Sequence, residues 1–201
     1  MRIRSFIAAA AGSLALIVAG QAGAVSVVGA TRVVVSNAIP TWLQVAEVEA
    51  IEFGTLDNVA SQASGGVASA SSVYGGGYLA TNANDGNTSG SMFHSGSPDG
   101  SQFLQIILGH TSTLTRLTLW GSTEGFNGRD LYTVTIYNGA NEVLYSGNLD
   151  SRVDRLSSVT FDDPISTGGG GVPEPATWAM MILGFGAVGT VVRSRRRMAW
   201  A

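Results

Sequence analysis

The chain has 201 residues, of which 12% are charged and none is cysteine, so disulfides, thiolate metal sites and cysteine nucleophiles are excluded. All 11 basic residues are arginine, and six of them lie in the two ends of the chain. The remaining five face all 14 acidic residues within residues 25–177, a net charge near −9 that disfavours nucleic acid as a partner.

The first 24 residues have the order of a secretory signal peptide. Arg2 and Arg4 precede an apolar run over residues 6–19, and Ala22-Gly23-Ala24 follows as a cleavage site. We expect the secretion machinery to export the chain and signal peptidase to cut it, so that the mature protein begins at Val25. An N-terminal anchor that is kept is the alternative.

Residues 25–165 predict an all-β fold of short strands joined by turns, as in a β-sandwich. The segment 41–53 mixes alternation with a step, so we expect a strand that bends or carries a bulge. Residues 103–109 are nearly all apolar, which predicts a strand covered on both faces. Residues 58–102 are rich in Gly, Ser, Ala and Asn, and predict loops anchored by apolar side chains. Further strands are expected at 31–36, 112–121, 131–139, 141–149 and 156–163.

Several motifs of this middle region resemble, in order, those of the discoidin-like, galactose-binding-like jelly rolls, a superfamily that includes the fucolectins. They are NVA at 58–60, SSVY at 71–74, ANDGN at 83–87, Ser95 and LG at 108–109. The resemblance implies a jelly-roll β-sandwich over residues 25–165. One stretch departs from it, because LQVAEV at 43–48 resembles the strand that usually closes such domains. Either the domain is permuted or this strand has another role.

The resemblance also implies a structural calcium ion in the loop that carries ANDGN. Carboxylate, amide and hydroxyl oxygens are the ligands that calcium prefers. The alternative is an ordinary Asn/Asp/Gly turn whose side chains bond their own backbone. The matching positions are Glu47, Asn82, Asp85, Asn87 and Ser95.

The fucolectin sugar site uses two arginines seven residues apart and a histidine after the calcium-loop serine. Here Arg129 fits the second arginine, but Ser122 stands at the first position and His94 precedes Ser95, so we expect no fucose-type site. Another sugar could bind at the same loop end, where aromatic faces and a few polar groups form a usual ligand site. The residues predicted for it are His94, Trp120, Phe126, Asn127 and Arg129.

Each of these residues has a plainer interpretation. Trp120 could pack in the core or at its rim, His94 could be a turn residue, and Arg129 could pair with Asp130 or Glu124 at the surface. No metalloprotease or nucleophile-elbow motif is present, so we expect no catalysis. Two further functions stay open: a purely structural surface or matrix protein, and, less favoured, an enzyme that acts on glycans.

The C-terminal region predicts a membrane helix. A Gly/Pro linker at 166–175 precedes 17 uncharged residues at 176–192, the short end of the range that spans a bilayer. The arginines after this run favour a cytoplasmic tail at 193–201. GFGAVG at 184–189 matches a dinucleotide-binding fingerprint, but no strand precedes it and no room is left for a βαβ unit. The arginines are Arg193, Arg195, Arg196 and Arg197.

This region resembles the PEP-CTERM sorting signal in its PEPxxWA variant. The matches are Pro173-Glu174-Pro175, Trp178, the glycine-containing helix and the arginine cluster. The resemblance implies an exported protein of a Gram-negative bacterium that is held transiently in the inner membrane. An exosortase-type membrane protease would then remove the helix and send the protein to the cell surface or an exopolysaccharide matrix. An ordinary single-span anchor is the alternative.

Overall fold

The computed structural model of this chain describes residues 25–163, and they form an all-β fold, as predicted. The leader at 1–24 and the predicted linker, membrane helix and arginine tail lie outside the described residues. No helix within 25–163 is long and apolar enough to cross a membrane. The strands are β1 (Val27–Asn37), β2 (Gln44–Val45), β3 (Glu47–Glu52), β4 (Val67–Ala70), β5 (Phe93–His94), β6 (Phe103–Trp120), β7 (Leu131–Asn138), β8 (Val143–Asp150) and β9 (Leu156–Thr160).

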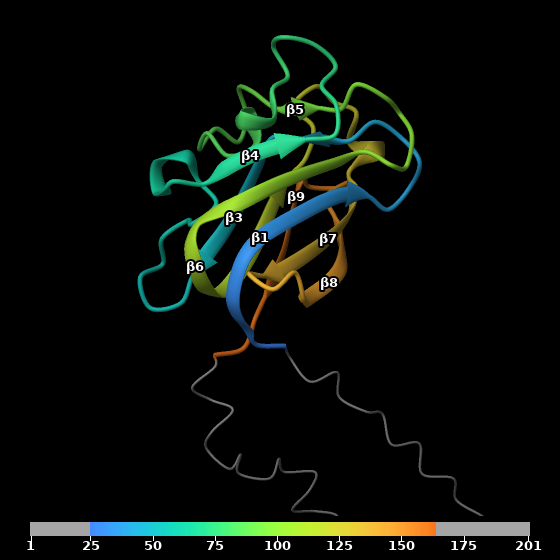
Figure 1. The fold of residues 1–201 in the computed structure, drawn as a ribbon. Helices are drawn as coiled ribbons and strands as arrows, with labels where there is room; N and C mark the ends of the chain where they lie inside the picture. The colour runs from blue at the N-terminus through green and yellow to red at the C-terminus, as the bar shows by residue number, and fades with distance from the viewer. Residues whose placement is uncertain (1–24, 164–201) are drawn as a thin grey trace, which may run out of the picture.

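The long strand β6 organises the fold (Figure 1). Its first half pairs with β1 on one side and β4 on the other, and its second half pairs with β3 and β9. β1 continues the sheet to β7 and β8, and every pairing is antiparallel. The two short strands β2 and β5 pair separately.

β6 replaces the two strands that were predicted at 103–109 and 112–121. β1 pairs with residues of β6 on both sides of Gly109, with register shifts between Val27 and Arg32. The N–H of Gly109 donates to the carbonyl of Val59 at 3.0 Å, which ties the middle of the strand to a neighbouring loop. The prediction that residues 103–109 are covered on both faces is wrong. Leu104, Ile106 and Leu108 are buried, whereas Phe103 and Ile107 on the other face are 39% and 49% exposed.

The core is formed by the inward-facing alternate residues of the strands, as period-2 patterns predict. The bend expected in 41–53 is present as Ala46, which separates β2 from β3 and whose N–H donates to the carbonyl of Trp120 at 2.8 Å. The strands β4 and β5 lie in the loop-rich segment 58–102, where the sequence predicted none. Fully buried core residues include Val33, Val35, Val48, Phe93, Leu117, Leu119, Tyr132, Val134 and Ile136.

The two ends of the described chain lie side by side. The N–H of Asp162 donates to the carbonyl of Val25 at 3.2 Å. Figure 1 shows both ends leaving from one end of the molecule, with β5 and its neighbouring loops at the opposite end. Neither end of the described chain therefore lies near β5.

Candidate functional site

A small layer of backbone hydrogen bonds around β5 brings three segments of the chain together. On one side the N–H of Ser95 donates to the carbonyl of Leu43 at 2.9 Å, next to β2. On the other side the N–H of Tyr74 donates to the carbonyl of His94 at 2.9 Å. The N–H of His94 donates to the carbonyl of Tyr78 at 3.3 Å. Residues that are distant in the sequence thus become neighbours.

These segments carry four rings that we call the aromatic cluster: Trp42, Tyr74, Tyr78 and His94. His94 lies at the centre, with ring centroids 4.8 Å from Tyr74, 5.1 Å from Trp42 and 5.4 Å from Tyr78. His94 is 7% exposed, whereas Tyr74 is 60% exposed. The His94 Nδ1 lies 2.8 Å from the carbonyl of Ser95, so in the neutral ring Nδ1–H donates there and Nε2 is left as an acceptor.

The loop between β6 and β7 faces the aromatic cluster. It contributes Glu124, Phe126 and, from the short turn η3 (Asn127–Arg129), Arg129. The Glu124 carboxylate accepts the hydroxyl of Tyr78 at 2.6 Å, and this hydrogen bond raises the pKa of Tyr78, which keeps it a donor. The Arg129 guanidinium lies over the Phe126 ring, 4.4 Å from its centroid.

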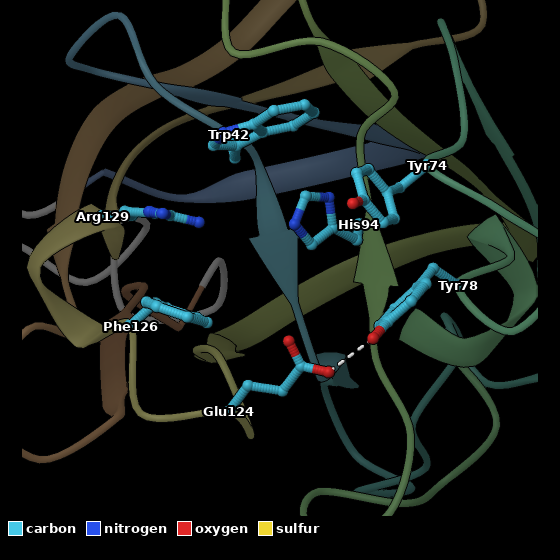
Figure 2. A pocket seen from close by; sticks show the side chains of 7 residues that line it. All are labelled: Trp42, Tyr74, Tyr78, His94, Glu124, Phe126 and Arg129. Atoms are coloured by element: carbon cyan, nitrogen blue, oxygen red, sulfur yellow. Dashed lines mark hydrogen bonds between the residues drawn. The ribbon is translucent and has the colours of Figure 1, made fainter.

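The aromatic cluster and the β6–β7 loop together line a pocket of about 290 Å³, shown in Figure 2. The figure shows Arg129 between Trp42 and Phe126, with Glu124 and Tyr78 linked on another side. The pocket therefore combines aromatic faces, one carboxylate and one guanidinium, which is a usual composition for a small-ligand site.

A buried carboxyl group, that of Asp130, lies next to Arg129 in the chain. Asp130 is fully buried, and one carboxylate oxygen accepts the N–H of Ser122 at 2.9 Å. Burial raises the pKa of Asp130 to about 6, although the Ser122 hydrogen bond, Tyr132, Arg155 and Arg129 act against that rise. Arg155 also clamps the same corner, because its Nε donates to the carbonyl of Ser122 at 2.6 Å.

The structure brings three of the five predicted sugar-site residues into this pocket. His94, Phe126 and Arg129 line it, and Asn127 lies beside them in η3. Arg129 makes no ion pair within 4.0 Å in the described part of the chain, so its surface pairing with Asp130 or Glu124 is not observed. Its Nη1 instead lies 3.4 Å from the side-chain oxygen of Gln44.

The fifth predicted residue, Trp120, lies elsewhere. It ends β6 on the outer face of the β3–β6–β9 sheet and lines a second groove of about 230 Å³. Its neighbours there are Glu49, Arg116, Thr118, Leu156 and Ser158. The plainer interpretation, a residue that packs at the rim of a sheet, describes this position.

Sequence reasoning missed four pocket residues: Trp42, Tyr74, Tyr78 and Glu124. The sequence predicts loops anchored by apolar side chains in this region, yet Tyr74 is among the most exposed aromatic residues described. The only local signal was the spacing of Tyr74 and Tyr78 around three glycines, where the N–H of Tyr78 donates back to Gly75 at 3.0 Å. The hydrogen bonds that gather these residues connect distant segments, which local patterns do not reveal.

The loop residues predicted to bind calcium use their oxygens within the loop. Asp85 accepts the N–H of Asn87 at 2.8 Å and the hydroxyl of Ser91 at 2.8 Å, and Asn87 accepts the N–H of Gly90 at 2.7 Å. These are the self-bonded turns that the sequence left as the alternative. Asn82 donates through its amide to the carbonyls of Gly77 and Met92.

Ser95 lies apart from this loop. Its hydroxyl accepts the N–H of Leu43 and donates to the carbonyl of Ser97, both at 2.9 Å. Within residues 25–163 no three His, Cys, Asp or Glu side chains are grouped to hold a metal. The five predicted ligands therefore do not form one ready set, and calcium stays a prediction.

Glu47 is the exception among these residues. It is 1% exposed, and one oxygen accepts the N–H of Gly86 at 3.1 Å while its Oε1 has no hydrogen-bond partner in the described structure. Burial raises the pKa of Glu47 to about 7, and the nearby Asp85 and Glu49 add to the rise. Among the predicted ligands, Glu47 is the one with a buried side-chain oxygen that has no hydrogen-bond partner in the described structure.

The C-terminal segment matches a known family. Residues 171–197 match the PEP-CTERM protein-sorting motif, which includes the predicted Pro-Glu-Pro, Trp178 and arginine positions. The match supports an exported protein that exosortase, a membrane protein, sorts to the cell surface. No curated protein and no solved structure matches the chain.

Proposed function

We propose that the β domain binds carbohydrate in the pocket of Figure 2, without catalysis, at the cell surface or in an exopolysaccharide matrix. The observation that carries this proposal is the exposed face of Tyr74 beside Trp42 and His94, opposite Arg129 and Glu124. An aromatic face suits the apolar face of a sugar ring, and the polar groups suit its hydroxyls. The proposal agrees with the discoidin-like, fucolectin-related resemblance of the sequence.

A glycan array tests the proposal with the full chain, kept in solution by a mild detergent because of its apolar C-terminal run. We expect binding that Tyr74→Ala weakens about three- to tenfold, the usual effect of losing one aromatic contact of about 0.5–1.5 kcal/mol. Phe103→Ala removes an exposed aromatic residue that does not line the pocket and should change nothing.

Three results would contradict this proposal. Equal binding by wild type and Tyr74→Ala would place the sugar elsewhere. No binding to any glycan would favour the structural matrix protein. Release of reducing ends from a bound polysaccharide would show that the protein is an enzyme.

We further propose that exosortase cuts near Pro173-Glu174-Pro175 and discards the segment that follows. The sorting motif supports this step, and prolines keep the backbone extended, as a protease active site needs. Mass spectrometry of the protein at the cell surface should find no peptide from residues 193–197. Replacement of the three motif residues by alanine should leave that peptide in the membrane fraction. An intact tail at the surface would instead indicate a single-span anchor.

A further inference from the structure

The pocket has one permanent cation, Arg129, which forms no ion pair within 4.0 Å in the described part of the chain. Arg129 lies over the Phe126 ring and 3.4 Å from the neutral amide of Gln44, and the ion pairs of the described residues do not include it. A guanidinium presents a planar fork of N–H donors that matches a carboxylate. The Arg129 wall thus offers a site for an anionic group.

The opposite charge lies on another wall. Glu124 accepts the Tyr78 hydroxyl at 2.6 Å, and Figure 2 shows this pair apart from Arg129. A carboxylate ligand is attracted at Arg129 and repelled at Glu124, whereas ligand hydroxyls can donate to Glu124. The pocket therefore orients a ligand that has a carboxylate at one end and hydroxyls at the other.

Two further observations restrict the ligand. The rim is open, since Tyr74 is 60% and Phe126 is 48% exposed, so a longer chain can extend out of the pocket. The segment 25–177 carries a net charge near −9, which repels a densely charged polyanion. A single acidic sugar within an otherwise neutral glycan meets both conditions.

We propose that the pocket recognises a hexuronate residue within an otherwise neutral glycan, and this inference rests on the glycan binding proposed above. The uronate carboxylate pairs with Arg129. The sugar ring lies against Tyr74 and Trp42, and hydroxyls donate to the Glu124 carboxylate and to Nε2 of His94. Arg129 is then the residue that selects acidic over neutral sugars.

The test compares two probes by calorimetry on the full chain in mild detergent. One is a xylo-oligosaccharide that bears a single glucuronate, and the other is the same molecule with its carboxyl group reduced to an alcohol. We expect the acidic probe to bind about tenfold more tightly, because a charge-assisted contact is roughly twice as strong as a neutral one. Added salt should reduce this difference, since the rim is exposed.

Substitutions of Arg129 test whether this residue causes the difference in affinity between the two probes. Arg129→Gln should lower the affinity for the acidic probe to that for the reduced probe. Arg129→Lys should keep part of the preference for the acidic probe because it keeps the charge. Arg152→Gln is the matched control, since Arg152 pairs with Asp150 outside the pocket, and it should change neither affinity. Thermal melting checks that each variant is folded.

The outcomes separate this inference from the proposed function. Equal affinity of wild type for both probes overturns uronate recognition but leaves glycan binding intact. If a folded Arg129→Gln variant binds neither probe, Arg129 is a general sugar contact. That result would also overturn uronate recognition. If neither these probes nor any glycan on the array binds, both proposals fail.

Discussion

At the scale of single residues, two buried carboxyl groups lose their stabilising contribution to the fold as the pH rises. Burial raises the pKa of Glu47 from 4.5 to about 7 and that of Asp130 from 3.8 to about 6. The folded state therefore holds these protons more tightly than the unfolded state. Their contribution to stability is present in full below about pH 4 and is lost as the pH rises towards 7.

Glu47→Gln should remove the part of this loss that Glu47 causes. An amide has no charge to bury, and its oxygen can still accept the N–H of Gly86. Relative to wild type, the variant should gain on the order of 2 kcal/mol of unfolding free energy between about pH 5 and pH 8, since one pKa unit corresponds to about 1.4 kcal/mol. Urea titrations across this range measure the difference. Asp154→Asn removes a charge from an exposed turn and should leave the pH dependence unchanged.

The same Glu47→Gln variant tests calcium binding in thermal melts. If a cation binds the free oxygen of Glu47, added calcium should raise the melting temperature of wild type at about pH 8, and EDTA should reverse the rise. Glu47→Gln should abolish this response. An identical melting temperature with calcium and with EDTA would remove calcium from the account and leave Glu47 as a buried acid.

At the scale of elements, the continuity of β6 depends on Gly109. A side chain at this position would collide with the backbone carbonyl of Ser64, because the η1 turn (Gln62–Ser64) passes directly over the strand. This close approach joins the loop-rich segment to the middle of the sheet. The strand that pairs with β1, β3, β4 and β9 thus tolerates only glycine at its centre.

Gly109→Ala should therefore lower the free energy of unfolding by about 1–3 kcal/mol, the usual cost of forcing an extra carbon into a packed site. Urea titration of wild type and variant at one pH measures it. Gly76→Ala is the matched control, because a Cβ there meets nothing within 4 Å, and its effect should stay within about 0.5 kcal/mol. Equal stability of the two variants would show that the η1 turn moves freely.

The strands could be predicted from the sequence more fully than the pocket. Alternating apolar residues predicted β7, because one face of that strand is buried and the other is not. The sequence also predicted strands over parts of β1, β8 and β9. The joining of two predicted strands into β6 could not be predicted, since it depends on pairing with β1 across an irregular register and on a loop that packs against Gly109. Tyr74 and Trp42 come together through backbone hydrogen bonds on the two sides of β5, from Tyr74 to His94 and from Ser95 to Leu43, which join residues distant in the sequence.

At the scale of the whole molecule, the pocket and the chain ends lie at opposite ends of the fold. The β5 loops carry the aromatic cluster, while Val25 and Asp162 are joined at the far end (Figure 1). The sorting motif at residues 171–197 follows the second of these ends. A protein attached through that side would present the pocket away from the attachment point, which suits a surface protein that binds glycans.

The indole N–H signals of two tryptophans test most directly whether the pocket binds glycans. Trp42 lines the pocket and Trp120 lines the groove on the outer β3–β6–β9 face, so their indole N–H signals report on the two candidate surfaces. NMR spectra of the full chain in mild detergent, titrated with neutral and glucuronate-bearing xylo-oligosaccharides, should show the Trp42 signal moving and the Trp120 signal unchanged. Movement of Trp120 alone, or of neither signal, would contradict glycan binding in the pocket.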